Sequence, residues 1–242
     1  MIIIMLGAPG TGKGTVGGLL SEYLKIPHIS SGEIFRGYIK EDEELGKELK
    51  KYVSSGKLVP DELTIEILKR RLQEEDTLNG YILDGFPRTV HQAECLDKLL
   101  KEKNQYVDVA VNLSLSDDEI VDRISKRRTC PNPTCREIYN LDFKKPKIDG
   151  ICDKCGNKLI IREDDNEITV RERLKNYHNL SEDLIEFYKN KDILYTVKLN
   201  NESNKVSSDV AKEIKDYVGK YGDKVWKIIT TLFQTQLCLK KW

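Results

Sequence analysis

The chain has 242 residues, of which 39% are hydrophobic and 33% are charged. Lysine plus arginine equal aspartate plus glutamate at 40 each, so the formal net charge is zero. This composition indicates a globular protein of one or two domains and excludes a chain that is largely membrane-embedded or disordered. Zero net charge gives no overall attraction to nucleic acid, so a bound polyanion must be held by a local cluster of cations.

The apolar run at residues 1–6 is too short for a secretory signal or a membrane-spanning helix. We therefore expect a cytoplasmic protein with neither a membrane nor a nucleic acid as partner. Thiols stay reduced in the cytosol, and four of the six cysteines crowd into residues 130–155. Metal binding is the first interpretation of these four cysteines.

Predicted strands alternate with predicted helices along most of the chain. Runs rich in β-branched residues predict buried strands over 2–6, 81–84 and 107–113, with weaker candidates over 26–30 and 193–199. Apolar periodicity and capping sequences predict helices over 14–24, 61–75, 89–103, 117–127, 167–189 and 207–219. The alternation predicts an α/β fold with a parallel five-stranded sheet flanked by helices.

Three segments do not fit this alternation. Residues 31–59 are helical in pattern and rich in lysine, and residues 128–163 contain the paired cysteines with several prolines and glycines. We interpret both as excursions from the core. Residues 221–242 have two open interpretations, which are an amphipathic helix lying on the core or on a partner, and a tail without function.

A glycine-rich segment, Gly7 to Thr15, follows the first predicted strand and opens the first predicted helix. Glycines let backbone N–H groups converge on an anion, the helix N-terminus adds partial positive charge, and the Lys13 amine can reach the β and γ phosphates. The segment therefore predicts a phosphate-binding loop formed by Gly10, Thr11, Gly12, Lys13, Gly14 and Thr15, which the family resemblance described below assigns to ATP. The alternative, a merely tight turn, would not need four glycines and a lysine.

A magnesium ion is expected beside this loop. Gly14 follows Lys13 directly and the hydroxyl comes one place later, at Thr15, which weakens direct ligation of Mg²⁺ by that hydroxyl. We expect Mg²⁺ to be held largely through water and phosphate oxygens, with Asp84 as the carboxylate nearby. The alternative role for Asp84 is a turn residue before Gly85.

The phosphate loop combined with Asp84-Gly85-Phe86-Pro87-Arg88 resembles the nucleoside monophosphate kinases, most closely the adenylate kinase family in its form with a long zinc-binding lid. Similar motifs follow in order: Ser30-Ser31-Gly32-Glu33 with Arg36, Gly56-Lys57-Leu58-Val59-Pro60, Val121-Asp122-Arg123 with Arg127-Arg128, Arg162-Glu163-Asp164-Asp165, and Thr169-Val170-Arg171-Glu172-Arg173-Leu174. The resemblance implies a core at 1–29, 60–126 and 165–220, a helical monophosphate-binding (AMP-binding) insertion at 30–59, a small zinc-binding lid at 127–164, and a tail of unknown role at 221–242.

The resemblance implies reversible, Mg²⁺-dependent transfer of the γ-phosphoryl group of ATP to AMP, giving two ADP, by a monomer that serves adenine nucleotide homeostasis and AMP salvage. Such a reaction needs positioning and electrostatic stabilisation more than covalent catalysis. The acceptor oxygen of AMP is already ionised, so no general base is required. The three histidines, His28, His91 and His178, stand in no catalytic motif and are interpreted as structural or surface residues.

The resemblance assigns six arginines to the phosphates, because a forked guanidinium suits a phosphate group. Arg36 and Arg88 would bind the AMP phosphate, Arg123 and Arg127 the ATP side, and Arg162 and Arg173 would close over the transferring group. The implied catalytic set is Lys13, Asp84, Arg88, Arg123, Arg127, Arg162 and Arg173. The other arginines considered are interpreted as solvated charges on helix faces: Arg70, Arg71, Arg128, Arg136 and Arg171.

Gln92 is the predicted selector of the base, because its carboxamide can pair at once with the N1 acceptor and the N6 donor of adenine. The alternative is that Thr89 to Gln92 forms only a helix-capping box. The resemblance implies an AMP pocket of Ser31, Arg36, Lys57, Leu58, Val59, Gly85, Phe86, Pro87, Arg88, Gln92, Arg162 and Arg173. It also places Ser203 against the adenine of ATP.

The spacing Cys130-x₄-Cys135-x₁₆-Cys152-x₂-Cys155 is typical of a four-thiolate zinc site, with disulfides and iron in the same thiolate cage as alternatives. Four protein ligands leave no open coordination position, so we expect a structural Zn²⁺. A stretch of about 35 residues with few large apolar side chains cannot build its own core, and a metal clip would replace one. The other two cysteines, Cys95 and Cys238, fit no pairing.

Other functions remain open at this stage. Within the kinases, the alternatives are an enzyme that accepts uridylate, cytidylate or guanylate and an enzyme that uses GTP as the donor. Outside the kinases, the alternatives are a nucleotide hydrolase and a non-enzymatic nucleotide-sensing or interaction protein. The arginine set argues against a mere binder, because a binder needs no clamp on a second phosphate.

Overall fold

The structure is a computed structural model that describes residues 1–41, 43–199 and 207–220. Two of the sequence predictions, Ser203 and the tail at 221–242, lie outside the described residues. Within the described ranges, no helix combines the length and the apolar character that crossing a membrane requires.

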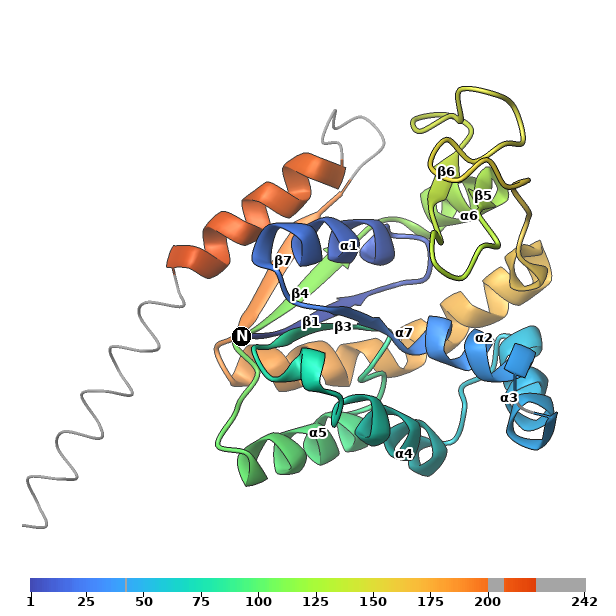
Figure 1. The fold of residues 1–242 in the computed structure, drawn as a ribbon. Helices are drawn as coiled ribbons and strands as arrows, with labels where there is room; N and C mark the ends of the chain where they lie inside the picture. The colour runs from blue at the N-terminus through green and yellow to red at the C-terminus, as the bar shows by residue number, and fades with distance from the viewer. Residues whose placement is uncertain (42, 200–206, 221–242) are drawn as a thin grey trace, which may run out of the picture.

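The centre of the molecule is a sheet of five parallel strands in the order β2-β3-β1-β4-β7 (Figure 1). The strands are β1 (Ile2–Gly7), β2 (His28–Ser30), β3 (Tyr81–Asp84), β4 (Val109–Ser114) and β7 (Leu194–Lys198). The first strand lies in the middle, where Ile4 is in register with Leu83 on one side and with Ala110 on the other. This confirms the predicted α/β fold class.

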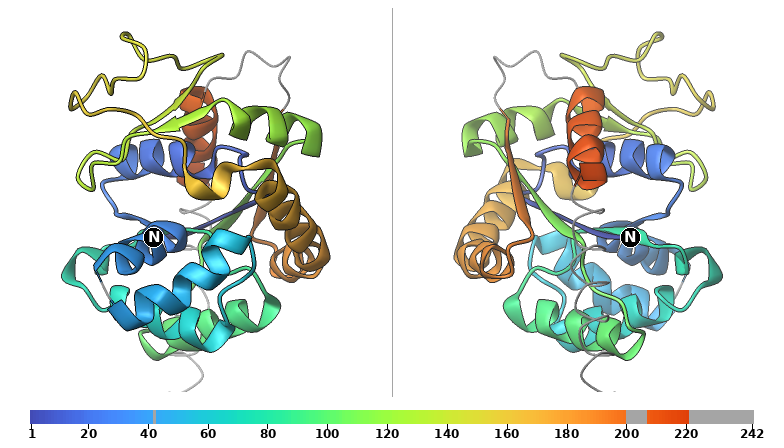
Figure 2. Two further views of the ribbon diagram at one scale, coloured as in Figure 1. Left: turned by 90° about the vertical axis from the view of Figure 1, so that its right-hand side faces the viewer. Right: turned by 90° about the vertical axis from the view of Figure 1, so that its left-hand side faces the viewer.

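Helices cover both faces of this sheet, as Figure 2 shows end-on. Their bounds are α1 (Lys13–Leu24), α2 (Ser31–Glu41), α3 (Glu43–Ser55), α4 (Asp61–Arg71), α5 (Val90–Glu102), α6 (Asp117–Ser125) and α7 (Glu167–Asn190), followed by a helix over 207–220. Two short 3₁₀ helices are η1 (Glu75–Thr77) and η2 (Glu163–Asp165), and the lid carries an antiparallel pair, β5 (Arg127–Thr129) and β6 (Ile138–Asn140).

The alternation of side chains along β1 builds two cores. Ile2 and Ile4 point to the face covered by α4, α5 and α7, whereas Ile3 and Met5 point to the face covered by α1 and the 207–220 helix. Both faces are buried, which explains why β1 is a continuous apolar run. The α2–α3 insertion adds Leu49 to the first of these cores, so it is anchored to the sheet as well as projecting from it.

Several element ends differ from the sequence predictions, and three of them have a clear physical reason. The helix predicted over 61–75 ends at Arg71, whose guanidinium binds Asp76 in the turn that follows. The helix predicted over 117–127 ends at Ser125, because Arg127 already pairs with Asn140 in the lid. The strand predicted over 26–30 begins at His28, since Pro27 has no N–H to donate to a ladder.

The fold gathers the predicted site at one edge of the sheet. The phosphate loop follows β1, Ser31 follows β2, and Asp84 ends β3, so all three lie at the carboxyl ends of parallel strands, where ligands bind in open α/β sheets. Figure 1 shows the lid and the α2–α3 pair projecting beyond the same edge.

Candidate functional site

The phosphate loop forms a turn that leads straight into α1. Gly10 and Gly12 have φ of 90° and 96°, values that residues with a side chain rarely adopt, and a Cβ on Gly10 would lie 2.8 Å from the Ile124 side chain. Gly12 precedes the first helical residue, Lys13, and has no side chain with which to cap the helix. The N-terminal N–H groups of α1 therefore face the loop without a side-chain cap, as an anion site requires.

Lys13 lies folded over this loop. Its Nζ donates to the carbonyl oxygens of Gly7 and Ala8, each at 2.7 Å. Burial lowers the pKa of Lys13 to about 8; Asp84 opposes this shift, while Arg88 and Arg173 add to it. The amine is thus desolvated and placed at the loop centre, where a phosphate would be a stronger partner than two carbonyls.

Asp84 stands beside the loop as a buried residue, with its side chain 11% exposed. Burial alone would raise its pKa, but contact with His28 and the charge of Lys13 outweigh burial and hold the pKa of Asp84 below its usual value. The Nε2 atom of His28 lies 3.4 Å from the Asp84 carboxylate, so this histidine has a structural position within the site. An ionised carboxylate here suits a hydrated Mg²⁺, since hard cations prefer oxygen ligands.

A cavity of about 1010 Å³ opens from the phosphate loop between the lid and α2. All six sequence-predicted arginines line it, together with Lys13 and Asp84: Arg36, Arg88, Arg123, Arg127, Arg162 and Arg173. They come from α2, the segment after β3, α6, β5, the end of the lid and α7. The fold therefore brings together guanidiniums that are up to 137 positions apart in the sequence, 173 minus 36.

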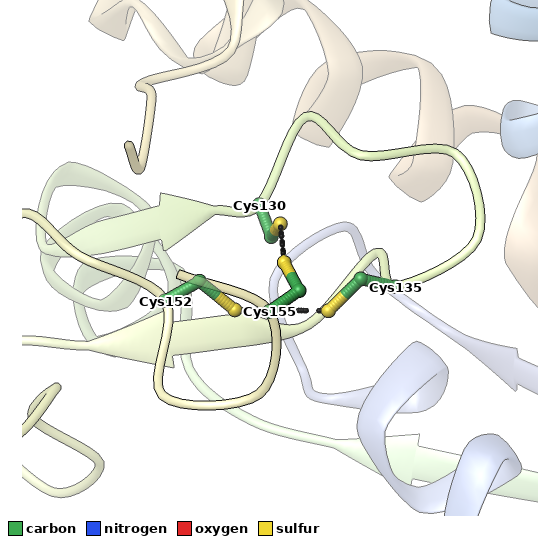
Figure 3. Close-up of side chains that lie close together, drawn as sticks. All are labelled: Cys130, Cys135, Cys152 and Cys155. Carbon is green, nitrogen blue, oxygen red and sulfur yellow. Dashed lines mark hydrogen bonds between the residues drawn. The ribbon is translucent and has the colours of Figure 1, made fainter. Parts of the chain in front are cut away.

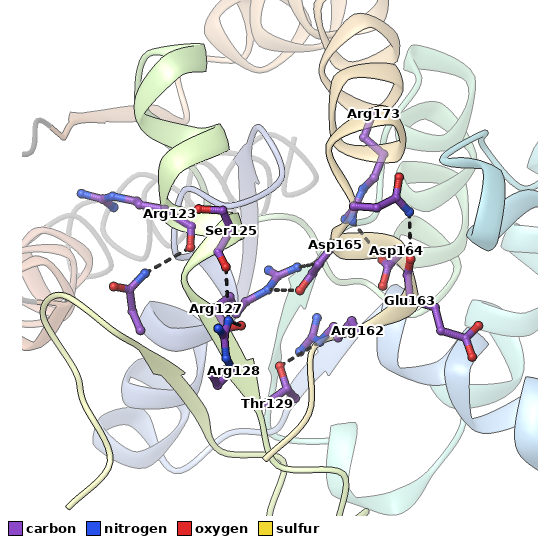
Figure 4. A network of polar contacts seen from close by, with 12 residues as sticks. Arg123, Ser125, Arg127, Arg128, Thr129, Arg162, Glu163, Asp164, Asp165 and Arg173 are labelled. Carbon is purple, nitrogen blue, oxygen red and sulfur yellow. Dashed lines mark hydrogen bonds and ion pairs between the residues drawn. The ribbon is translucent and has the colours of Figure 1, made fainter. Parts of the chain in front are cut away.

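Two aspartates organise part of this arginine cluster (Figure 4). The Arg127 guanidinium binds Asp165 through two nitrogens, and Arg173 Nη1 donates to Asp164 at 2.9 Å. Asp164 and Asp165 are buried, at 6% and 8% exposed, and the sequence interpretation gave them no role. The available signal was two adjacent acidic residues directly after Arg162, at the end of the lid motif.

The positive charge of Arg162 is compensated less directly than the charges of Arg127 and Arg173, which bind aspartates. Its Nε donates to Thr129 Oγ1 at 3.1 Å, and burial followed by repulsion from Arg127 and Arg36 lowers the pKa of Arg162 to about 9. Burial and the charge of Arg173 likewise lower the pKa of Arg88 to about 10. Buried cations that repel one another favour an incoming anion, so the electrostatics indicate a polyphosphate site.

A smaller pocket adjoins this cavity, and the residues around it include Gly32, Arg36, Lys57, Leu58, Val59, Thr64, Gly85, Arg88, Gln92 and Arg173. The Gly85 carbonyl accepts hydrogen bonds from Ser31 Oγ at 2.8 Å and from Arg88 Nε at 2.9 Å, which fixes the base of the arginine. Most of the predicted AMP-binding residues therefore share one pocket. The side chain of Phe86, by contrast, packs in the hydrophobic core, and Pro87 lines the larger cavity.

The four lid cysteines converge (Figure 3). All four Sγ atoms lie within 4.8 Å of one another, with Cys130 to Cys155 at 3.3 Å and Cys135 to Cys152 at 3.6 Å. A tetrahedral zinc–thiolate site with bonds of about 2.3 Å has sulfur–sulfur distances near 3.8 Å, so the donors and spacing are compatible with zinc. The structure forms no disulfide among the described cysteines, which are these four and Cys95.

Arg136 was predicted to be a solvated charge, and this prediction is wrong in part. Arg136 is half exposed, but it lines the large cavity and donates to Glu33 of α2 at 3.0 Å. This ion pair joins the lid to α2 across 103 positions of sequence. No local pattern could indicate it, because the partner is set by how the lid lies over α2.

Comparison with known proteins agrees with this geometry. The family model described as adenylate kinase matches residues 5–193. A similar protein named adenylate kinase occurs in Acetivibrio thermocellus and is 49% identical over 81% of this chain and 90% of the relative. Another protein of that name, from Clostridium tetani, is 48% identical over 87% of this chain and 97% of the relative. A third, from Caldicellulosiruptor saccharolyticus, is 46% identical over 88% of this chain and 99% of its own.

Proposed function

Because the chain belongs to the adenylate kinase family, whose members are ATP:AMP phosphotransferases, we propose that it transfers the γ-phosphoryl group of ATP to AMP and gives two ADP. The observation that carries the proposal is the placement of six arginines around one cavity that joins the phosphate loop to a second pocket. A protein that binds a single nucleotide without transferring a phosphoryl group would not need cations at both ends of the cavity.

The two ends of the cavity suit different substrates. The donor, ATP, would lie along the phosphate loop with Arg123 and Arg127 on its far side. The acceptor, AMP, would lie in the smaller pocket with its phosphate toward Arg36 and Arg88. Arg162 and Arg173 would neutralise charge on the group in transit, which is the main demand of phosphoryl transfer.

Magnesium fits this arrangement as the metal bound with ATP. The ionised Asp84 carboxylate lies next to Lys13 and α1, so it would receive the waters of a hydrated Mg²⁺. The ion would supply charge neutralisation between the phosphates, while the arginines and Lys13 hold the phosphates in place. The acceptor oxygen is ionised, so the protein has no proton to remove.

The lid serves this reaction by excluding water, which would otherwise compete with AMP as the acceptor. We propose a structural Zn²⁺ on the four lid thiols, away from the chemistry. We further propose a cytoplasmic monomer that acts in adenine nucleotide homeostasis and AMP salvage, without nucleic acid or a membrane as partner.

Phosphoryl transfer is tested by measuring ADP formation from Mg²⁺-ATP with AMP, UMP, CMP or GMP supplied in turn. We expect strong stimulation by AMP, and at least a ~100-fold loss of kcat in Lys13→Ala and Arg88→Ala, because each removes a preorganised charge. Arg171→Ala is the matched control, since Arg171 lies on the exposed face of α7 paired with Glu167. ATP binding without acceleration by any monophosphate would instead favour a nucleotide-sensing protein.

The pKa of Lys13 predicts how ATP binding depends on pH. The free amine loses its proton as the pH rises through about 8, whereas bound phosphate stabilises the charged form and raises that pKa. Binding therefore takes up a proton at high pH, and ATP affinity should fall by up to about tenfold per pH unit above pH 8. Calorimetry without Mg²⁺ between pH 7 and 9.5 measures this dependence. Lys13→Arg, which keeps its charge, should flatten it; parallel profiles for the two proteins would contradict the assignment.

Metal analysis tests the lid. We expect one zinc per chain in the purified protein, retained in Cys95→Ser and lost in Cys130→Ser and Cys152→Ser. Loss of the metal should lower the midpoint of thermal unfolding by about 5 °C or more, because metal binding contributes to the folding of the lid. Iron in place of zinc would contradict the choice of metal but not the thiolate cage.

A further inference from the structure

The carboxamide of Gln92 is held at both of its ends. Its Oε1 accepts a hydrogen bond from the Arg88 backbone N–H at 2.7 Å, and its Nε2 donates to Asp61 Oδ1 at 2.7 Å. The residue is only 2% exposed, yet Gln92 lines the smaller pocket. Its polar end is therefore fixed by protein groups at the pocket wall, instead of turning freely in solvent.

These two partners determine which way the amide faces. A backbone N–H can only donate and a carboxylate can only accept, so a half-turn of the amide would set oxygen against oxygen and N–H against N–H. The cost would be two lost hydrogen bonds between buried groups. Each end of the amide keeps one position for a ligand, which is a lone pair on Oε1 and a proton on Nε2.

Asp61 is itself held in place by several contacts. It is the first residue of α4, where the helix N-terminus favours a negative charge. Its Oδ2 accepts from the Thr89 hydroxyl at 2.8 Å and lies 3.2 Å from His91 Nδ1. The carboxylate is thus fixed between α4 and the start of α5, and only one of its two oxygens is left for Gln92.

We propose that Asp61 is a positioning residue that sets the base specificity of the acceptor pocket by fixing the orientation of the Gln92 amide; this rests on the proposed function. Adenine presents an acceptor, N1, beside a donor, the 6-amino group. A 6-oxopurine presents the reverse pair, N1–H beside an oxygen. An amide held in one orientation matches one of these pairs and opposes the other, whereas an amide free to flip accepts both.

The experiment compares AMP with IMP, because the two differ only at N1 and position 6 of the base. The measured quantity is the ratio of kcat/KM for AMP to kcat/KM for IMP, with dissociation constants from calorimetry as a second reading of the same preference. In Asp61→Ala we expect this ratio to fall about tenfold or more, the value of one or two lost directional hydrogen bonds. The change should come mainly through KM, since the arginines that act on the phosphate are untouched.

Two controls separate orientation from a general loss of structure. His91→Ala removes an exposed ring that faces Asp61 Oδ2, the oxygen that Thr89 also holds, and leaves the bond from Gln92 to Oδ1, so the AMP to IMP ratio should stay unchanged. Asp61→Asn keeps the size of the side chain but can turn either end of its amide toward Gln92, so it should also lower the ratio, and by less than Asp61→Ala. Thermal unfolding of each variant reports whether it is folded.

A double variant gives the sharpest test. In a Gln92→Ala background, the Asp61→Ala change should alter the ratio no further, because Asp61 acts only through that amide. Equal losses for AMP and IMP in Asp61→Ala, or a further change of the ratio in the double variant, would overturn the proposal. Failure of the proposed function is distinguishable, since the unchanged protein would then form no ADP in response to AMP.

Discussion

Repulsion between buried cations is the constraint on which the rest of this structure depends. Arg88, Arg162 and Lys13 are desolvated around one cavity, and burial together with the charge of neighbouring arginines lowers the pKa of each. Such a cluster opposes folding unless carboxylates or bound anions offset it. Asp84, Asp164 and Asp165 offset part of it, and the remaining positive potential is what a polyphosphate would neutralise.

The layout of the fold follows from that constraint, because no single element can carry all of these charges. They are distributed over the core, the α2–α3 insertion and the lid, and these parts meet at the cavity. Ion pairs hold the parts in position: Arg127 with Asp165 at the base of the lid, and Arg136 with Glu33 across the mouth. The first pair is buried and positions a guanidinium, whereas the second is half exposed, and exposed ion pairs contribute little to stability.

Local patterns in the sequence predicted the parts of the molecule that local physics determines. The β-branched runs predicted the strands, the glycines and Lys13 predicted the phosphate loop, and the spacing from Cys130 to Cys155 predicted a cluster that the structure forms. The features that the sequence did not predict depend on contacts between residues that are far apart in the chain. The contacts of Asp61 and Arg136 are with partners 31 and 103 positions away, which only the packing of α4 on α5 and of the lid over α2 brings close. Helix ends were misplaced where a tertiary contact, such as Arg127 with Asn140, begins the next element early.

Phosphate binding and base choice require different physical interactions in one pocket. Coulomb attraction has little directionality, so the arginines would hold the phosphate of any nucleoside monophosphate equally well. Discrimination must therefore come from directional hydrogen bonds between buried groups, whose cost when mismatched exceeds their gain when made. Gln92 is a neutral side chain of this kind, and the groups that orient it, the Arg88 N–H and the Asp61 carboxylate, belong to the segment after β3 and to α4. Arg88, whose side chain would bind the phosphate, thus also orients the proposed base selector through its backbone N–H, and this would couple the two ends of the acceptor within a single turn of chain.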